Sequence, residues 1–464
     1  MMTSLWDSVA RPGTSRKGVL HAARGSVALA ELETASCLDL EREWFRGRSV
    51  LLALREQMST AIALLELDGI ARRLVLCTPD LSAERLAEVA ASAQTDVVLA
   101  DDSAELPGAL GPIHRLRRLQ SRPTFAPTER REATASEWIL LTSGTTGAPK
   151  LVAHSLASLA GFLPRQPPEP GSVWSTFYDI RRYGGLQIYL RAVLSGCPLV
   201  LSSPTEATEE FLARAGAQAV THISGTPSHW RRALMSGAAG RLNPKYVRLS
   251  GEVADQMVLD QLRATFPGAR IGHAFASTEA GVAFEVDDGL AGFPAAFLNG
   301  GARGVDMKVE DGTLRIRSQR IAGGYVGAAA AGLSAEDGYV DTGDLVELQG
   351  GRYYFRGRKG GVINVGGQKV YPEEVESVLN ADPRVRMSLV RARRNPIMGA
   401  IVVADVVLND QDGTARAERA AENIKSELLQ ACRRALPAHK VPAMLRLVPA
   451  LELTAAGKLV RPDA

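Results

Sequence analysis

Short apolar runs alternate with helical stretches through the first hundred residues, and this alternation limits the chain to few folds. The runs 49–55, 73–77 and 96–99 are strand-like, whereas 58–67 and 82–91 place apolar residues at helical spacing. Strands that alternate with helices form βαβ units, in which parallel strands are buried on both faces. The pattern therefore predicts an α/β fold built on parallel sheets. A chain of 464 residues also exceeds the usual size of one domain.

The pattern changes near residue 300. From there to about residue 356, short alternating segments with Gly-rich turns predict a small antiparallel β module that closes the first domain. The final hundred residues indicate an α+β unit with a long helix over 417–436. We therefore predict a large N-terminal domain over 1–357, with parallel α/β sheets and the β module, and a mobile C-terminal lid domain over 358–464.

Charge and cysteine usage narrow the cellular context. The net charge of +3 gives no reason to expect nucleic acid or an anionic membrane surface as a partner. The four cysteines, Cys37, Cys77, Cys197 and Cys432, show no CxxC pair and no metal-ligand spacing, which is typical of reduced cytoplasmic thiols. No run of about 18 apolar residues predicts a membrane span, and residues 1–7 do not resemble a signal peptide. We expect a cytoplasmic protein.

A glycine- and hydroxyl-rich loop stands in the middle of the chain. The strand-like run Ile139–Leu141 leads into Thr142, Ser143, Gly144, Thr145, Thr146 and Gly147, and Lys150 follows shortly after. Glycines allow the backbone to approach a ligand, and clustered N–H and hydroxyl groups with a lysine suit phosphate oxygens. No Gly-Lys-Ser/Thr ending closes the loop, so it is not a Walker A loop. A phosphate-binding loop and a plain Gly/Ser/Thr turn both stay open at this point.

Four further motifs follow this loop in order. They are Phe275-Ala-Ser-Thr-Glu279, Tyr339-Val-Asp-Thr-Gly-Asp344, the stretch from Gly357-Arg358 to Val375, and Thr454-Ala-Ala-Gly-Lys458. In this order and spacing, the five motifs resemble the adenylate-forming (AMP-binding) superfamily of acyl-CoA synthetases, peptide-synthetase adenylation domains and luciferases. The resemblance covers roughly residues 135–464, and the residues before it carry no motif of the family.

The resemblance implies a reaction in two steps. A carboxylate attacks the α-phosphate of ATP to give an acyl-adenylate, and a thiol of CoA or of a carrier-protein phosphopantetheine arm then displaces AMP. By this resemblance Lys458 bridges the acyl carboxylate and the α-phosphate, while Thr278 contacts the α-phosphate. Lys150 lies on the pyrophosphate side, and Glu279 is the carboxylate associated with Mg²⁺. The implied cofactors are ATP and Mg²⁺, with CoA or phosphopantetheine as co-substrate.

The resemblance also implies a nucleotide site. Phe275 would lie against adenine, and Asp344 would accept both ribose hydroxyls, with Arg358 reaching the ribose as well. The other predicted members of this site are Thr142, Ser143, Gly144, Thr145, Thr146, Gly147, Ser250, Gly251, Glu252, Ala276 and Ser277. The segment Ser250-Gly251-Glu252 departs from the family, which more often has two glycines followed by a small residue.

The C-terminal region matches the lid domain of the family. Gly360 stands at the hinge position, where the family often has Asp or Lys, and glycine gives a hinge rotational freedom. Rotation would exchange Lys458 for the face that carries Gly366, Gly367 and Lys369 between the two steps. Lys369 stands where the family more often has Arg, which keeps the charge but loses the planar fork.

The acyl pocket is predicted to be compact. Tyr183, Gly184, His222 and Phe284 are its predicted lining residues, and their bulk favours a compact or aromatic acid over a long acyl chain.

We therefore predict an AMP-forming acid–thiol ligase that acts on a small carboxylic acid. Three alternatives stay open: amino-acid adenylation, a monooxygenase that uses its adenylate with oxygen, and a non-catalytic nucleotide-binding homologue. Amino-acid activation ranks lower because Asp179 is near, but not at, the matching position of the carboxylate that would hold an ammonium group. Retention of Glu279, Asp344 and Lys458 together argues against a non-catalytic homologue.

Overall fold

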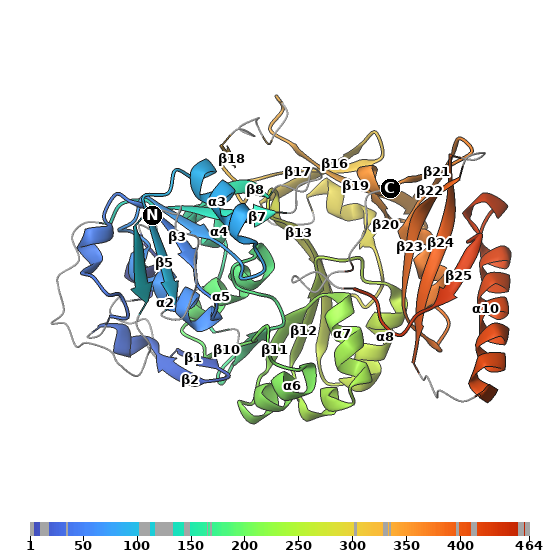
Figure 1. Ribbon diagram of the computed structural model, residues 1–464, viewed down its shortest axis with the longest axis horizontal. Coiled ribbons are helices and arrows are strands. Elements are labelled where there is room, and N and C mark those ends of the chain that lie inside the picture. Colours follow the sequence, from blue (N-terminus) through green and yellow to red (C-terminus); the bar gives the residue numbers. More distant parts are fainter. Residues whose placement is uncertain are drawn as a thin grey trace.

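The structure is a computed structural model. It describes residues 4–9, 18–33, 36–101, 112–116, 133–142, 149–164, 166–167, 169–300, 304–327, 333, 336–395, 399–409, 415–452 and 459. In Figure 1 the first hundred residues, in blue, lie at the left, and residues 200–300, in green to yellow, lie in the middle. The residues after about 360, in orange to red, form a separate group at the right.

One sheet has seven strands in the order β18-β8-β7-β4-β3-β5-β6. Their bounds are β3 (Ser49–Ala53), β4 (Arg73–Leu76), β5 (Val97–Asp101), β6 (Ile113–Leu116), β7 (Glu137–Thr142), β8 (Lys150–Ser155) and β18 (Gly324–Val326). The five strands β7, β4, β3, β5 and β6 are parallel neighbours. Their apolar runs are buried because α2 (Gln57–Leu67) packs on one face and α3 (Ala83–Ser92) on the other. The predicted βαβ pattern is confirmed.

Strand β8 was not predicted from the sequence. It follows the glycine- and hydroxyl-rich loop and pairs antiparallel with β7, so that Lys150 stands directly opposite Thr142. The loop is therefore bounded by the two ends of one hairpin, and Lys150 opens a strand.

The second sheet has eight strands in the order β14-β13-β12-β11-β9-β10-β1-β2. Their bounds are β1 (Val19–Ala22), β2 (Gly25–Ala28), β9 (Trp174–Thr176), β10 (Leu199–Leu201), β11 (His222–Gly225), β12 (Tyr246–Ser250), β13 (Arg270–Ser277) and β14 (Gly281–Val286). The strands from β1 to β13 in this order are parallel, and the outer strands β2 and β14 are antiparallel.

Helices cover both faces of this second sheet. On one face α5 (Tyr183–Ser195) packs in the core that joins the two sheets, and Tyr246 of β12 belongs to that core. On the other face Val247 and Leu249 pack against α6 (Thr208–Ala217), α7 (Pro227–Met235) and α8 (Gln256–Thr265). We call the face toward α5 the inner face. Because side chains alternate along a strand, Tyr246, Arg248 and Ser250 share it.

The predicted β module is a five-stranded antiparallel sheet in the order β15-β20-β19-β17-β16. Its strands are β15 (Phe293–Pro294), β16 (Val305–Glu310), β17 (Thr313–Ser318), β19 (Val340–Gln349) and β20 (Arg352–Arg358). Apolar residues of β14 and of these strands share one core, so the module closes the edge of the second sheet.

The C-terminal unit has its own core. Its elements are β21 (Ile363–Val365), β22 (Gln368–Val370), α9 (Pro372–Asn380), β23 (Val385–Asn395), β24 (Gly399–Leu408), α10 (Ala415–Ala435) and β25 (Met444–Leu447). Gly366 and Gly367 form the two-residue turn between β21 and β22, with φ of 57° and 86°. Both angles favour glycine, because a Cβ strains the left-handed region. The predicted fold class is confirmed.

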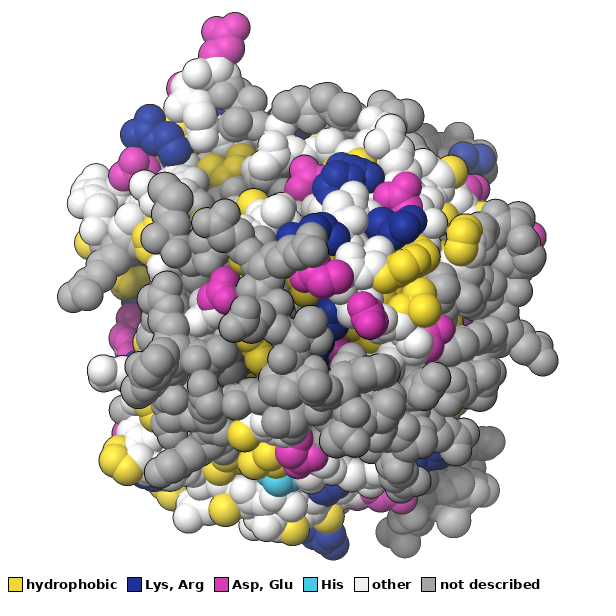
Figure 2. All heavy atoms as spheres, turned by 90° about the vertical axis from the view of Figure 1, so that its left-hand side faces the viewer, with side chains coloured by type: hydrophobic (Ala, Val, Ile, Leu, Met, Phe, Trp, Pro, Cys, Tyr) yellow, Lys and Arg dark blue, Asp and Glu magenta, His cyan; other side chains and the backbone are white. Residues whose placement is uncertain are grey.

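Short elements complete the described chain. They are α1 (Leu5–Val9), α4 (Leu156–Ala160), and the 3-10 turns Leu29–Glu33, Arg42–Phe45, Ala238–Arg241, Ala295–Asn299, Lys359–Gly361 and Ala438–Lys440. Within the described ranges, no helix combines the length and apolar character needed to cross a membrane. On the face drawn in Figure 2, acidic and basic side chains are mixed, in keeping with the small net charge.

Candidate active site

The predicted site residues gather where parallel strands end. Ser250 ends β12 and Gly251 and Glu252 follow it, and the motif Phe275–Glu279 closes β13 and its turn into β14. Neighbouring parallel strands place such ends at one edge of the sheet, where open α/β sheets bind their ligands. Two motifs that lie about 25 residues apart in the sequence are therefore side by side.

Glu279 lies within reach of two other polar groups. The Tyr325 hydroxyl donates to Glu279 Oε1 at 3.5 Å, and Lys150 Nζ lies 5.4 Å from the centre of the Tyr325 ring. Tyr325 belongs to β18, which pairs with β8. The strand pairing thus brings the lysine at the end of the loop to the carboxylate of the second motif.

A magnesium ion fits this carboxylate. The described residues hold no group of three or more His, Cys, Asp or Glu side chains that would bind a metal without help. Mg²⁺ commonly takes one or two carboxylates, phosphate oxygens and several waters. Half-buried Glu279 keeps lone pairs free beyond its long bond to Tyr325, and it would hold the ion. Bound there, Mg²⁺ would neutralise charge on the phosphates.

His154 positions the backbone of Thr278, and the sequence analysis did not identify it. His154 Nε2 lies 2.7 Å from the Thr278 carbonyl oxygen and Nδ1 lies 3.0 Å from Ser158 Oγ. Burial lowers the pKa of His154 to about 4, so the ring is neutral at pH 7. The neutral ring donates from Nε2 to the carbonyl and accepts from the Ser158 hydroxyl at Nδ1. No local pattern pointed to His154, because its partner Thr278 lies 124 residues further along the chain.

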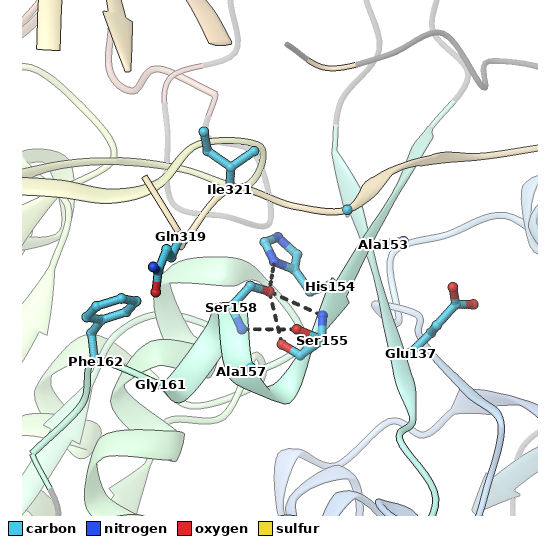
Figure 3. A pocket seen from close by; sticks show the side chains of 11 residues that line it. Glu137, Ala153, His154, Ser155, Ala157, Ser158, Gly161, Phe162, Gln319 and Ile321 are labelled. Carbon is cyan, nitrogen blue, oxygen red and sulfur yellow. Dashed lines mark hydrogen bonds between the residues drawn. The ribbon is translucent and has the colours of Figure 1, made fainter. Parts of the chain in front are cut away.

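A pocket of about 640 Å³ opens beside His154. Figure 3 shows His154 pointing toward Ser158, whose hydroxyl oxygen also accepts the backbone N–H of Ser155 at 3.2 Å at the start of α4. Phe162, Gln319 and Ile321 line the opposite side. The reciprocal bonds of Ser155 and Ser158 form a capping box that fixes the start of α4, and with it the histidine.

The predicted ribose-binding pair is formed across two strands of the β module. Asp344 and Arg358 stand opposite each other on β19 and β20, and Arg358 Nε lies 3.2 Å from Asp344 Oδ1. Arg358 Nη2 also donates to the Thr342 carbonyl oxygen at 2.8 Å. Phe275 stacks on Phe355 of β20 at 5.2 Å, which brings the predicted adenine and ribose residues together.

Glu252 has two roles in the structure. Its carboxylate accepts the Ser228 N–H at 2.9 Å and the Ser228 hydroxyl at 3.0 Å, at the start of α7. Glu252 Oε1 also accepts the backbone N–H of Leu459 at 3.3 Å. Leu459, which follows Lys458 in the sequence, therefore lies at the edge of the sheet where the other described motifs gather.

The predicted acyl-pocket residues divide between two places. Buried Tyr183 begins α5, Gly184 follows it, and His222 begins β11 with its ring 4.6 Å from that of Trp174 on the inner face. Phe284 does not join them. It stacks with Phe275 and packs against Phe293 in the core under the β module, because it pairs with Phe275 on the outer face of β13.

The carboxylate of Asp179 is paired with the side chain of Arg181. Its two carboxylate oxygens accept from Arg181 Nε at 2.7 Å and from Arg181 Nη2, and Arg181 is fully buried. This bidentate pair holds the turn into α5 and leaves Asp179 little capacity to bind a substrate ammonium group.

The remaining predicted residues lie elsewhere. Ser143, Gly144, Thr145, Thr146, Gly147 and Lys458 lie outside the described residues. Gly360 lies in the turn Lys359–Gly361, where a Cβ would meet no described atom within 4 Å. Lys369 is exposed in the middle of β22, the strand that begins directly after the turn Gly366-Gly367.

Comparison with known proteins decides the family. Residues 32–326 match the AMP-binding enzyme family and residues 374–458 match its C-terminal domain. The first match alone covers more than half of the chain. The chain belongs to the AMP-binding enzyme family. The match begins at residue 32, so residues 32–134, which carry no motif, are part of the family domain as well.

Curated relatives of this AMP-binding enzyme are ligases and a synthetase. The 2-succinylbenzoate–CoA ligase of Salmonella typhimurium is 28% identical over 374 residues, which cover 79% of this chain and 78% of the ligase. The ligase of the same name from Listeria innocua is 27% identical over 73% of this chain and 71% of its own. The probable non-canonical nonribosomal peptide synthetase CymA of Salinispora arenicola is 29% identical over 82% of this chain, but only 5% of that protein is matched.

Solved structures share the fold along the whole chain. The o-succinylbenzoate CoA synthetase of Bacillus subtilis, in complex with its acyl-adenylate, has a TM-score of 0.76 at 20% identity and covers 98% of this chain and 96% of its own. The anthranilate CoA ligase AuaEII, in complex with anthranoyl-AMP, has a TM-score of 0.77 at 17% identity, with 98% and 95% covered. The predictions of an adenylate-forming fold and of an AMP-forming ligase are confirmed.

Proposed function

We propose that this AMP-binding enzyme activates a compact or aromatic carboxylic acid with ATP and transfers the acyl group to a thiol, either CoA or the pantetheine arm of a carrier protein. The observation that carries the proposal is the convergence of three sequence-distant groups at one sheet edge. These are the Thr278-Glu279 turn, the Asp344–Arg358 pair reached through Phe275 and Phe355, and the C-terminal segment at Glu252. The CoA-ligase names of the curated relatives support the thiol step.

Each group has a defined task in this proposal. Asp344 and Arg358 hold the ribose, and Lys150 and Thr278 lie along the phosphates. His154 keeps the Thr278 carbonyl turned away from the nucleotide, since it accepts the imidazole N–H. Lys458 enters with the C-terminal segment and offsets the charge that builds up between carboxylate and α-phosphate, which is the usual use of a preorganised cation. The acid enters along the inner face, beside Tyr183, Gly184 and His222.

We propose that the boundary between residues 357 and 358 separates the two working domains. Gly360 is the pivot, because it lies in a short turn with free space around it. Rotation replaces the segment of Lys458 by the hairpin of Gly366, Gly367 and Lys369 for the thiol step. Cytoplasmic placement agrees with four free and buried cysteines.

Amino-acid activation is a second candidate. The 29% identity to a peptide synthetase favours it, whereas the pairing of Asp179 with Arg181 does not.

A panel of acids with ATP and hydroxylamine tests the proposal. Hydroxylamine traps an activated acyl group as a hydroxamate, so aromatic and short branched acids should give hydroxamate and AMP, and amino acids should give much less. Long straight-chain acids should fall in efficiency as carbons are added, because a compact pocket rejects extra methylenes. No hydroxamate from any acid would contradict the proposed activity, and light or oxygen consumption would point to a monooxygenase.

A further inference from the structure

Two arginines from different domains meet where α7 contacts the lid. Arg232 lies in the last turn of α7, and Arg386 is the second residue of β23 in the lid. Helix α7 contacts β23, and in Figure 1 it lies on the side of the large domain that faces this strand. Both side chains are half-buried. The contact therefore brings two positive charges to the boundary between the domains.

These two guanidinium groups are poorly compensated. The Nε atoms of Arg232 and of Arg386 are both buried, and neither donates to an acceptor among the residues that the structure describes. Burial, and after it repulsion from Arg386, lower the pKa of Arg232, while attraction to Glu252 opposes the shift. Buried polar groups normally have hydrogen-bond partners, and a buried charge without a partner costs free energy. The contact between α7 and β23 is therefore electrostatically unfavourable at this point.

Neighbouring arginines do have carboxylate partners. Arg231 of α7 forms an ion pair with Asp255. Arg384, directly before β23, pairs with two carboxylates of the lid, Asp382 and Glu427. Within the described ranges, the chain thus pairs the arginines beside the boundary and leaves the two at the contact without an acceptor for Nε.

The repulsion belongs to one arrangement of the lid. In this arrangement Glu252 accepts the Leu459 N–H at 3.3 Å, so the residue next to Lys458 lies at the site. Glu252 also accepts the N–H and the hydroxyl of Ser228, so its carboxylate is engaged although it attracts Arg232. Strand β23 is part of the core of the lid. Rotation of the lid as one unit therefore ends the contact between β23 and α7.

We propose that the Arg232–Arg386 contact is a repulsive device that drives the lid out of the adenylation arrangement once the acyl-adenylate has formed. This inference rests on the lid rotation of the proposed function and adds the force that times it. While ATP is bound, its phosphates attract Lys458 and hold the C-terminal segment at the site against the repulsion. When the carboxylate oxygen bonds to the α-phosphorus, the bond to pyrophosphate breaks, and departing pyrophosphate takes most of the negative charge with it. The repulsion then outweighs the remaining attraction, and the lid rotates for the thiol step.

Spin labels measure the positions of the lid directly. Ala264→Cys of α8 and Ser426→Cys of α10 place one label on an exposed position of each domain, and the four native cysteines are buried. Pulsed electron spin resonance on the ligand-free, full-length protein gives the two lid arrangements as two distances between the labels. The distance that agrees with the present structure identifies the adenylation arrangement.

Charge variants at the contact should shift these populations. Arg386→Gln removes the repulsion and should raise the ratio of the adenylation arrangement to the rotated one about fivefold or more. Arg386→Glu, which attracts Arg232, should raise the ratio further, and adding Arg232→Glu to it restores like charges and should return the ratio toward the wild type. Should Arg386→Gln not fold, Arg232→Gln makes the same test from the other side of the contact.

A second arginine of β23 supplies the control. Arg393→Gln also removes one positive charge from this strand, but Arg393 is exposed and its guanidinium contacts Met444 of the lid. The ratio of the two arrangements should therefore stay at the wild-type value. An equal shift in Arg393→Gln and Arg386→Gln would overturn the inference, because net charge and not the contact would then set the populations.

Rates of the two half-reactions give the functional readout. With the synthetic adenylate of the acid that gives most hydroxamate, Arg386→Gln should transfer the acyl group to CoA about fivefold more slowly or less, in step with the shifted populations. Pyrophosphate exchange should not fall. A wild-type rate of the thiol step in a variant whose lid population has shifted would overturn the timing role.

The outcomes separate this inference from the proposed function. Equal populations in the wild type and in both Arg386 variants would refute the repulsive device and keep the lid rotation. A single distance in every variant would refute both. The labels report on the protein without substrate, so failure of every acid to give hydroxamate would remove the proposed activity, whereas a shift in Arg386→Gln would still support the device.

Discussion

Glu252 is the contact through which the C-terminal segment should control the first half-reaction. The backbone N–H of Leu459 donates to Glu252 Oε1 at 3.3 Å, and Lys458 precedes Leu459 in the chain. In Glu252→Gln, one amide oxygen replaces two carboxylate oxygens. The Ser228 N–H, at 2.9 Å, makes the shorter bond and should take that oxygen, which turns the amide NH₂ toward Leu459. The variant should therefore lose the contact with the C-terminal segment while it keeps the cap of α7.

The size of the effect follows from that one bond. A hydrogen bond to a charged group contributes roughly 1.5–3 kcal/mol, and a bond of this length belongs at the lower end. A loss of about 1.5 kcal/mol from the conformation that places Lys458 lowers adenylation about tenfold. Thioester formation from a preformed acyl-adenylate should stay near the wild-type rate, since it uses the other lid face.

The assay measures the two half-reactions separately. ATP–pyrophosphate exchange reports adenylation, and consumption of a synthetic acyl-adenylate by CoA reports the thiol step. Ser228→Ala is the matched control, because it removes the 3.0 Å bond from the Ser228 hydroxyl to Glu252 and leaves the Leu459 contact intact. Equal losses in both half-reactions, or the same loss in Ser228→Ala, would refute the reasoning and make Glu252 a helix cap only.

Three further predictions concern the hinge, the lid hairpin and acid stability. Gly360→Pro should spare pyrophosphate exchange and slow the thiol step, because proline fixes φ at the proposed pivot, and an unchanged ratio of the two rates would require another pivot. Gly367→Ala should lower the free energy of unfolding of the lid by about 1–2 kcal/mol, because φ at Gly367 is 86° and a Cβ strains that region. Gly360→Ala should lower it clearly less, because φ at Gly360 is not in the left-handed region. Denaturant unfolding of both variants compares the two losses. His154 is neutral in the fold because burial lowers its pKa from 6.5 to about 4, so the unfolded chain binds the extra proton and stability falls as pH drops from 6.5 to 4. Between pH 6.5 and 4 the free energy of unfolding of the wild-type protein should fall by up to about 3 kcal/mol more than that of His154→Gln. If the two unfolding free energies instead changed in parallel with pH, His154 would not titrate on unfolding.

Much of the fold could be predicted from local patterns in the sequence. The predicted helical stretches 58–67 and 82–91 agree with α2 and α3 to within one residue, and the runs 49–55 and 73–77 contain β3 and β4, because apolar spacing marks these elements locally. The long helix near the C-terminus was also found within two residues. Strand β8 was missed because its residues follow a loop and pair antiparallel with β7, and that pairing is a tertiary property.

Motifs predicted which residues form the site, whereas only the structure shows how those residues lie relative to one another. Asp344 and Arg358 are 14 residues apart in the sequence, and their ion pair depends on the β19–β20 register, which includes an irregularity between Leu345 and Val346. His154 carries no motif, and only the contact to Thr278 shows its role. Phe284 was grouped with Tyr183 by size, but a one-residue alternation along β14 places it on the opposite face.

The most direct test of the central claim follows the carboxylate oxygen. The acid that gives most hydroxamate is prepared with both carboxylate oxygens as ¹⁸O and incubated with ATP, Mg²⁺ and CoA, and AMP is analysed by mass. Attack of the carboxylate on the α-phosphate, followed by loss of AMP to the thiol, leaves one carboxylate oxygen on the phosphorus. AMP with a single ¹⁸O is therefore expected. Unlabelled AMP, or label in inorganic phosphate with ADP as the other product, would contradict it.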